Sequence, residues 1–90
     1  MELEWDEVER MQALLERGMD FADVAQFDFD TATTIMDNRV EYGERRLVST
    51  GYLNGRICVL SWTMRDGIMR VISLRKANER EQKKYSNSAE

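Results

Sequence analysis

Three β-prone runs in the second half of the chain form the clearest hydrophobic and polar pattern in the sequence. Asn54-Gly55 and Asp66-Gly67 interrupt these runs. Both dipeptides suit two-residue type I′ turns, whose central positions require positive φ angles. The pattern therefore predicts a three-stranded antiparallel meander over residues 45–53, 56–65 and 68–75.

Two short helices are predicted in the first half. Asp6 and Glu9 have the spacing of a capping box, so the first helix begins there. Gly18 ends it, because glycine enters the left-handed conformation at little cost. Asp20 caps the second helix. The residues expected to form the buried stripe of the first helix are Val8, Met11, Leu14 and Leu15.

Shorter patterns complete an α+β arrangement. Residues 2–5 alternate between polar and apolar and suit a short strand, and residues 33–36 are β-prone. Residues 37–44 are polar and predict a loop. The expected fold is an antiparallel sheet packed against two N-terminal helices, with a short helix at the C-terminal end.

That last helix, over residues 77–86, begins near Asn78 and Glu81 and has only Ala77 and Tyr85 as apolar anchors. So polar a helix usually faces solvent or binds a partner. Two alternatives follow. Tyr85 alone fastens the helix to the sheet, or an apolar face of the sheet stays open as an interaction site.

The two turns also fix the register of the meander, which sorts side chains by face. Counting back from the turns places Thr63 between Arg46 and Arg70, with Arg65 on the same face and Arg75 on the opposite one. The apolar residues expected on the face of the three arginines are Ile57, Val59, Ile72 and Leu74. Both faces are largely apolar, so both need a cover, and the N-terminal helices supply only one.

Composition limits the protein class. Ninety residues, 42% of them hydrophobic and 33% charged, with no proline, predict a single globular domain over residues 1–90. No apolar run is long enough to cross a membrane, and no basic-then-apolar leader is present, so a cytoplasmic protein is expected. The single cysteine, Cys58, and the absence of histidine exclude an internal disulfide and a histidine base. No metal or cofactor site is predicted.

Charge is divided unevenly along the chain. Residues 1–44 carry three arginines against thirteen acidic residues, whereas residues 45–90 carry ten basic residues against four acidic ones. Such asymmetry indicates that the second half meets an anionic partner. The alternative, given equal weight, is that the two halves neutralise each other in the fold.

An ordered set of short segments runs through nearly the whole chain. The segments are Glu4-Trp5-Asp6, Gly18, Phe21-Ala22-Asp23-Val24, Glu44-Arg45-Arg46, Gly51, Trp62-Thr63-Met64-Arg65, Arg70-Val71-Ile72-Ser73-Leu74-Arg75-Lys76-Ala77, Glu79-Arg80-Glu81 and Tyr85. The run over residues 70–77 is the most specific. In this order the sequence resembles the BrnT toxins.

The resemblance implies a RelE-like fold and a bacterial type II toxin–antitoxin system. The toxin would be a ribonuclease that cleaves RNA and blocks translation. Its partner would be a BrnA-like antitoxin that neutralises it and binds operator DNA, so this chain would meet DNA only indirectly. Direct DNA recognition is not expected, because the net charge is −4 and no recognition helix is evident.

The sequence departs from the family pattern at the first helix. Family members often carry Asn at position 13 and Lys-His before the glycine, whereas this chain has Ala13, Glu16 and Arg17. If the basic pair contributes to RNA cleavage, this chain is a weak or inactive toxin. If the pair only terminates the helix, activity is unaffected.

Arginines are the candidate catalytic residues for metal-independent cleavage, in which the RNA 2′-hydroxyl attacks the adjacent phosphate. A guanidinium matches phosphate bidentately and stays charged. The predicted catalytic arginines are Arg46, Arg65, Arg70 and Arg75. Arg46 and Arg70 are expected to converge on one phosphate, and Arg75 joins them only if the chain twists near the last helix.

Other groups complete the predicted site. Arginine does not serve as a base near neutral pH, so proton transfer falls to Tyr85, Lys76 or Glu79. Lys76 and Arg80 are predicted RNA-phosphate contacts. The competing hypothesis is a binding module without catalysis, which pairs with an antitoxin and acts as a transcriptional co-regulator.

Overall fold

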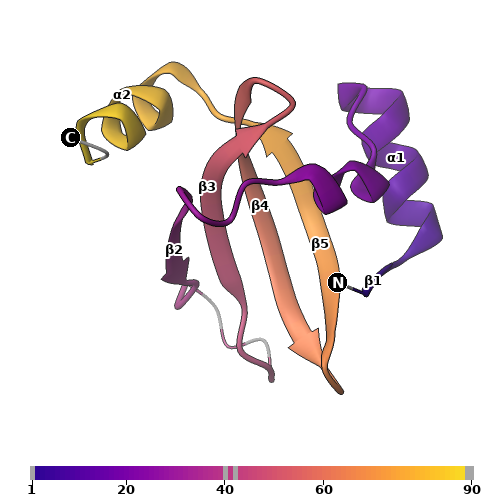
Figure 1. Cartoon of the computed structure of the whole chain (residues 1–90). Coiled ribbons are helices and arrows are strands. Elements are labelled where there is room, and N and C mark those ends of the chain that lie inside the picture. The colour runs from indigo at the N-terminus through magenta and orange to yellow at the C-terminus, as the bar shows by residue number, and fades with distance from the viewer. Residues whose placement is uncertain (1, 40, 42, 89–90) are drawn as a thin grey trace.

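A five-stranded sheet forms the centre of the molecule (Figure 1), with the strand order β1-β5-β4-β3-β2. The computed structural model describes residues 2–39, 41 and 43–88. Residues 40 and 42 of the predicted loop over 37–44 lie outside this described part. The strands are β1 (Leu3–Trp5), β2 (Thr33–Met36), β3 (Leu47–Leu53), β4 (Arg56–Arg65) and β5 (Ile68–Lys76). The helices are α1 (Glu7–Arg17), the 3₁₀ helix η1 (Phe21–Gln26) and α2 (Glu79–Ser88).

The meander of β3, β4 and β5 is confirmed, with both of its turns. Asn54 and Gly55 have φ angles of 50° and 84°, and Asp66 and Gly67 have 52° and 78°. Two consecutive positive φ angles are what a type I′ turn requires. The flanking residues pair as predicted, and Thr63 lies opposite Arg70.

The sheet is mixed, which corrects the prediction of a wholly antiparallel one. β1 pairs with β5 in the parallel direction, with Leu3 opposite Met69 and Trp5 opposite Val71. β2 adds an antiparallel strand at the other edge, beside β3. Both short strands were foreseen from local patterns. Their place in the sheet depends on which segments meet after the chain has folded back on itself.

α1 and η1 cover one face of the sheet, where the main core lies. Asp6 caps α1 by accepting from the backbone N–H groups of Val8 and Glu9, and Gly18 ends it at a φ of 65°. Buried side chains from η1 meet those of the central strands. The core residues are Ala13, Phe21, Val24, Phe27, Leu53, Cys58, Leu60, Met69, Val71 and Leu74. Burial raises the pKa of the Cys58 thiol, so Cys58 behaves as a small apolar residue.

The orientation of α1 differs from the sequence prediction. Ala13 is the buried residue of this helix, whereas Val8, Met11 and Leu15 face away from the core. The small Ala13 side chain permits close approach to the sheet. The Arg10 guanidinium binds the Asp20 carboxylate through Nε and Nη2 at 2.8 and 3.1 Å, which fixes the helix in this rotation.

A β-bulge in β5 changes which residues share a face. Ser61 lies opposite Ser73, but the next residue of β4, Trp62, lies opposite Val71, so Ile72 is an extra residue. The prediction that Leu74 shares the arginine face is therefore wrong. Leu74 lies opposite Leu60 and is fully buried in the core. An extra residue in a strand reverses which face each later side chain points to. The bulge therefore buries Leu74 and keeps Arg75 out of the core.

α2 partly covers the second face, on the side of the sheet where β3 and the edge strand β2 lie (Figure 1). Asn78 and Glu81 form the reciprocal capping box at its start, with bonds of 2.8 and 2.9 Å. Tyr85 is its buried anchor: the hydroxyl donates to the Thr31 carbonyl at 2.7 Å, and the ring contacts Tyr52 edge-on. Within the described residues, no helix has the length and apolarity needed to cross a membrane.

Candidate functional site

A pocket of about 550 Å³ lies between the second face of the sheet and α2. Its apolar lining comes from neighbouring strands and includes Ile35, Val48 and Val59. Hydroxyl groups enter from these strands and from β5: the residues are Thr33, Thr50, Ser61 and Ser73. A volume in this range suits a small ligand or a single nucleotide unit, because binding pockets commonly measure about 300–1,000 Å³.

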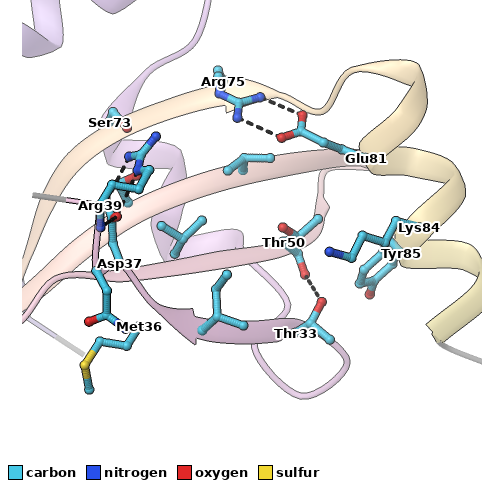
Figure 2. Close-up of a pocket in the computed structure, with 15 residues that line it drawn as sticks. Thr33, Met36, Asp37, Arg39, Thr50, Ser73, Arg75, Glu81, Lys84 and Tyr85 are labelled. Atoms are coloured by element: carbon cyan, nitrogen blue, oxygen red, sulfur yellow. Dashed lines mark hydrogen bonds and ion pairs between the residues drawn. The ribbon is translucent and has the colours of Figure 1, made fainter.

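Arg75 is the central cation of this pocket. The bulge turns it onto the face of Ser61 and Ser73, because Arg75 lies opposite Val59 in β4. The sequence prediction placed Arg75 on the opposite face and is corrected by the bulge. Nη1 and Nη2 of Arg75 donate to the two oxygens of Glu81 at 2.7 and 2.8 Å (Figure 2).

This bidentate Arg75–Glu81 pair, called the fork below, also sets the protonation of both groups. The hydrogen bonds from Arg75 lower the pKa of the Glu81 carboxyl to about 2, against desolvation that acts in the other direction. The same bonds raise the pKa of Arg75. Both side chains are partly exposed, at 42% for Arg75 and 30% for Glu81. A charged group entering the pocket therefore meets an accessible and fully ionised pair.

Two more cations border the pocket. Arg39 forms a second bidentate pair, with the Asp37 carboxylate at 2.9 and 2.8 Å. Lys84 extends from α2 on the side of the sheet that carries Thr50 (Figure 2), and no ion pair of Lys84 occurs within the described residues. Three basic groups against the two carboxylates of Asp37 and Glu81 leave the pocket lining with a formal excess of one positive charge.

Tyr85 is the only proposed proton-transfer residue that borders the pocket among those named from the sequence. Its buried hydroxyl is committed to the Thr31 carbonyl. Lys76 lies in register with Cys58, on the side of the core face, and is not part of the pocket lining. Glu79 and Arg80 are exposed on α2 and also lie outside that lining. A position on α2 or next to it in the sequence therefore does not by itself place a side chain in the pocket.

The other three candidate arginines form a separate group. Arg46 and Arg65 both bind Glu44: Arg46 through one contact of 3.5 Å, Arg65 through two bonds of 3.1 Å. Arg70 faces Glu4 at 3.6 Å. Arg46 and Arg70 thus have separate carboxylate partners, Glu44 and Glu4, and their convergence on one phosphate stays a prediction. This group lies near Thr63, four residues along β4 from Val59, which corresponds to about 13 Å of strand.

Charge neutralisation between the two halves of the chain is thus partial. Glu4 and Glu44 of the acidic half bind arginines of the basic half. Several basic residues of the second half form no ion pair within the described part of the chain. These residues are Arg45, Arg56, Lys76, Arg80 and Lys84. In the same part, no three cysteine or acidic side chains gather into a metal-ligating cluster.

Sequence reasoning missed three residues that define the pocket: Arg39, Glu81 as the partner of Arg75, and Lys84. Glu81 was identified only as a helix cap. One signal for the missed geometry exists in the sequence. The apolar residues Met69, Val71 and Leu74 are spaced by two and then three positions, which is the pattern that a bulge accommodates.

Comparison with known families decides the class of the protein. A sequence model that describes the ribonuclease toxin BrnT of type II toxin–antitoxin systems matches residues 5–81. The chain belongs to the BrnT family. Membership implies a type II ribonuclease toxin with an antitoxin partner. No curated protein matches the chain.

The departures from the BrnT pattern lie on the opposite side of the sheet from the pocket. Ala13 is buried against the core, and Glu16 and Arg17 are exposed at the end of α1. α1 packs on the core face, whereas the pocket opens on the second face. The altered residues in this BrnT-family chain are therefore separate from Arg75 and its surroundings.

Proposed function

We propose that this BrnT-family chain is a metal-independent endoribonuclease of the cytoplasm that inhibits translation and is neutralised by a BrnA-like antitoxin. The RNA phosphate at the cleavage site binds Arg75 in the pocket beneath α2. The observation that supports this proposal is the bidentate Arg75–Glu81 pair. In it, Arg75 already binds an anionic group, the Glu81 carboxylate, through two parallel bonds.

A phosphate oxygen pair has the same demand for two parallel N–H donors as a carboxylate. RNA therefore competes with Glu81 for the Arg75 fork. Arg39 and Lys84 add positive charge at the pocket, and the apolar lining at Ile35 and Val48 suits the flat face of a base. The surrounding hydroxyls are groups that hydrogen-bond ribose or phosphate.

The chemistry requires no group beyond the RNA, the protein and water. The ribose 2′-oxygen attacks phosphorus while its proton passes to water, the bond from phosphorus to the 5′-oxygen breaks, and that oxygen gains a proton. The products are a 2′,3′-cyclic phosphate and a 5′-hydroxyl. Arg75 stabilises the extra negative charge on the phosphate oxygens. The Lys84 ammonium is the proton donor that we assign to the leaving oxygen.

Arg46, Arg65 and Arg70 have a different part in this proposal. They lie on the same sheet face as Arg75 but about 13 Å along the strand, so they do not share its phosphate. We assign them to flanking phosphates of the RNA strand, together with Lys76 and Arg80 at the margin. Binding that depends on several phosphate contacts falls steeply with salt, through counterion release.

The deciding experiment measures cleavage of a single-stranded RNA by the purified chain in the presence of EDTA. Products with 2′,3′-cyclic phosphate ends are expected, and Arg75→Ala should lower the cleavage rate by about 100-fold or more, as for loss of one preorganised donor. Arg56→Ala is the matched control, because Arg56 is exposed and lies outside the pocket. Equal rates for the Arg75 variant and the parent would refute the site.

A second candidate function is the binding module without catalysis. The supporting observation is that each of the four candidate arginines has a carboxylate partner within the chain. Expression of the chain alone in bacteria separates the two functions. A toxin arrests growth and bulk translation, and Arg65→Ala or Arg75→Ala relieves the arrest with the fold intact. Normal growth with the parent chain supports the module.

A further inference from the structure

α1 carries an apolar stripe that no other part of the described chain covers. Val8 is 68% exposed, Met11 47% and Leu15 82%. Successive residues of an α-helix are rotated by about 100°, so these three positions fall on one side of α1. That side is opposite Ala13, which packs against the core. The stripe therefore points outward along about two helical turns.

The stripe does not contribute to the fold. The contacts that hold α1 in place are the buried Ala13, the Asp6 and Gly18 caps and the bidentate bond from Arg10 to Asp20. A helix needs one apolar face to pack on its own sheet. This helix packs with Ala13 and the partly buried Leu14 and leaves Val8, Met11 and Leu15 exposed. Clustered apolar residues in that position are typical of a protein–protein contact.

Carboxylates flank α1 beside the stripe and decide what kind of molecule it fits. On one side, beyond Gln12, lie Glu9 and Glu16, neither of which forms an ion pair within the described residues. On the other side lies Glu7, whose carboxylate binds Arg10 and Trp5. An acidic border repels RNA phosphates. It also disfavours a second copy of the chain, because two such stripes would bring Glu9 and Glu16 against like charges.

We propose that the α1 stripe is the surface on which the antitoxin docks, through an amphipathic helix with apolar residues flanked by lysines or arginines. Val8, Met11 and Leu15 have the i, i+3, i+7 spacing by which one helix packs on another. The basic flanks of the antitoxin helix pair with Glu9 and Glu16. The inference takes the partner class from the toxin–antitoxin family and does not depend on the RNA site.

The experiment uses the full chain and the protein encoded by the adjacent open reading frame, with affinity measured by titration calorimetry. Met11→Glu and Leu15→Glu are each expected to weaken the complex at least tenfold. Ile35→Glu is the matched control, since Ile35 is also an exposed apolar residue, at 66%, but lies on β2. RNA cleavage is measured in parallel and should be unchanged in both α1 variants, because α1 is remote from the pocket.

Charge is tested separately. Glu16→Lys should weaken the complex about fivefold or more and flatten its salt dependence, whereas Asp30→Lys, which makes the same charge change on an exposed loop, should do neither. Thermal unfolding confirms that the variants fold.

Four results would overturn the proposal. The first is that the adjacent gene product fails to bind the parent chain, and the second is that it binds the α1 variants as tightly as the parent. The third is that the Ile35 variant loses as much affinity as the α1 variants. The fourth is that the chain alone dimerises through α1 in sedimentation experiments. Loss of RNA cleavage in Arg75→Ala with intact antitoxin binding would leave this inference standing, so the two proposals fail independently.

Discussion

Arg75 and Glu81 form a guanidinium–carboxylate fork in which both bonds are short, at 2.7 and 2.8 Å. The same Glu81 oxygen that meets Nη1 of Arg75 also accepts the Asn78 backbone N–H at 2.9 Å. One carboxylate thus begins α2 and fastens it to β5. The cation of the proposed RNA site and the attachment of the C-terminal helix depend on the same contact.

Glu81→Gln is expected to increase RNA affinity by about three- to tenfold, because the phosphate no longer competes with a carboxylate for Arg75. Glutamine retains the side-chain acceptor of the capping box, so α2 still forms. Filter binding of a short RNA at fixed salt measures the effect. Glu79→Gln is the control: Glu79 lies on the same turn, and its ion pair within the described residues is with Lys83, at 3.9 Å. Weaker binding by the Glu81 variant would contradict the proposed competition.

The stability of α2 docking should depend on pH in the acid range. The pKa of Glu81 is about 2 in the folded chain, below its ordinary value of 4.5. The unfolded state therefore binds more protons between these values, and the stabilisation from the fork is complete above about pH 4.5 and lost as pH falls towards 2. Amide hydrogen exchange of α2 across this range measures the loss.

The Glu81→Gln variant provides the control for that pH dependence. Without an ionisable group at position 81, the exchange of α2 should show a smaller acid response than in the parent. α1 is an internal reference, because hydrogen bonds from Arg10 lower the pKa of Asp20 and that pair is unchanged. An identical acid response of α2 in parent and variant would exclude the fork as its cause.

Ser49→Ala should destabilise the chain by about 1–3 kcal/mol, the usual range for loss of a hydrogen-bond partner in the interior. The Ser49 hydroxyl is fully buried, accepts from the Trp62 indole at 2.8 Å and lies 2.7 Å from the Thr34 hydroxyl. Urea denaturation measures the change. Ser61→Ala, at a half-buried position of the neighbouring strand, should alter the free energy of unfolding by less than about 0.5 kcal/mol. Equal effects would indicate that the buried network is not responsible.

Gly51→Ala should cost about 1–3 kcal/mol, as overpacking of a tight core typically does. A Cβ atom at this position would lie 2.8 Å from the Ala32 Cβ and 3.1 Å from the Phe27 ring. The double variant with Ala32→Gly removes the closest contact and should recover part of the loss in thermal unfolding. Absence of any recovery would show that the Ala32 methyl group is not the obstacle.

Local sequence features determined the turns, the helix caps and the meander. Each depends on residues a few positions apart, such as Asn54 with Gly55 or Asn78 with Glu81. The interactions that form these features therefore lie within one short segment. A two-residue turn fixes the pairing of its flanking residues, and for this reason Thr63 and Arg70 lie opposite each other as predicted. The family resemblance rested on the same short segments and is confirmed.

Tertiary structure alone decided the faces and the partners of the functional side chains. The bulge at Ile72 moved Arg75 to the pocket, and close packing at Ala13 turned the apolar stripe of α1 outward. The convergence of Arg46 and Arg65 on Glu44 likewise joins residues that local patterns do not relate. These outcomes depend on which distant segments bury apolar surface against each other and which opposite charges pair. Such contacts stabilise the protein only after folding has brought the segments together.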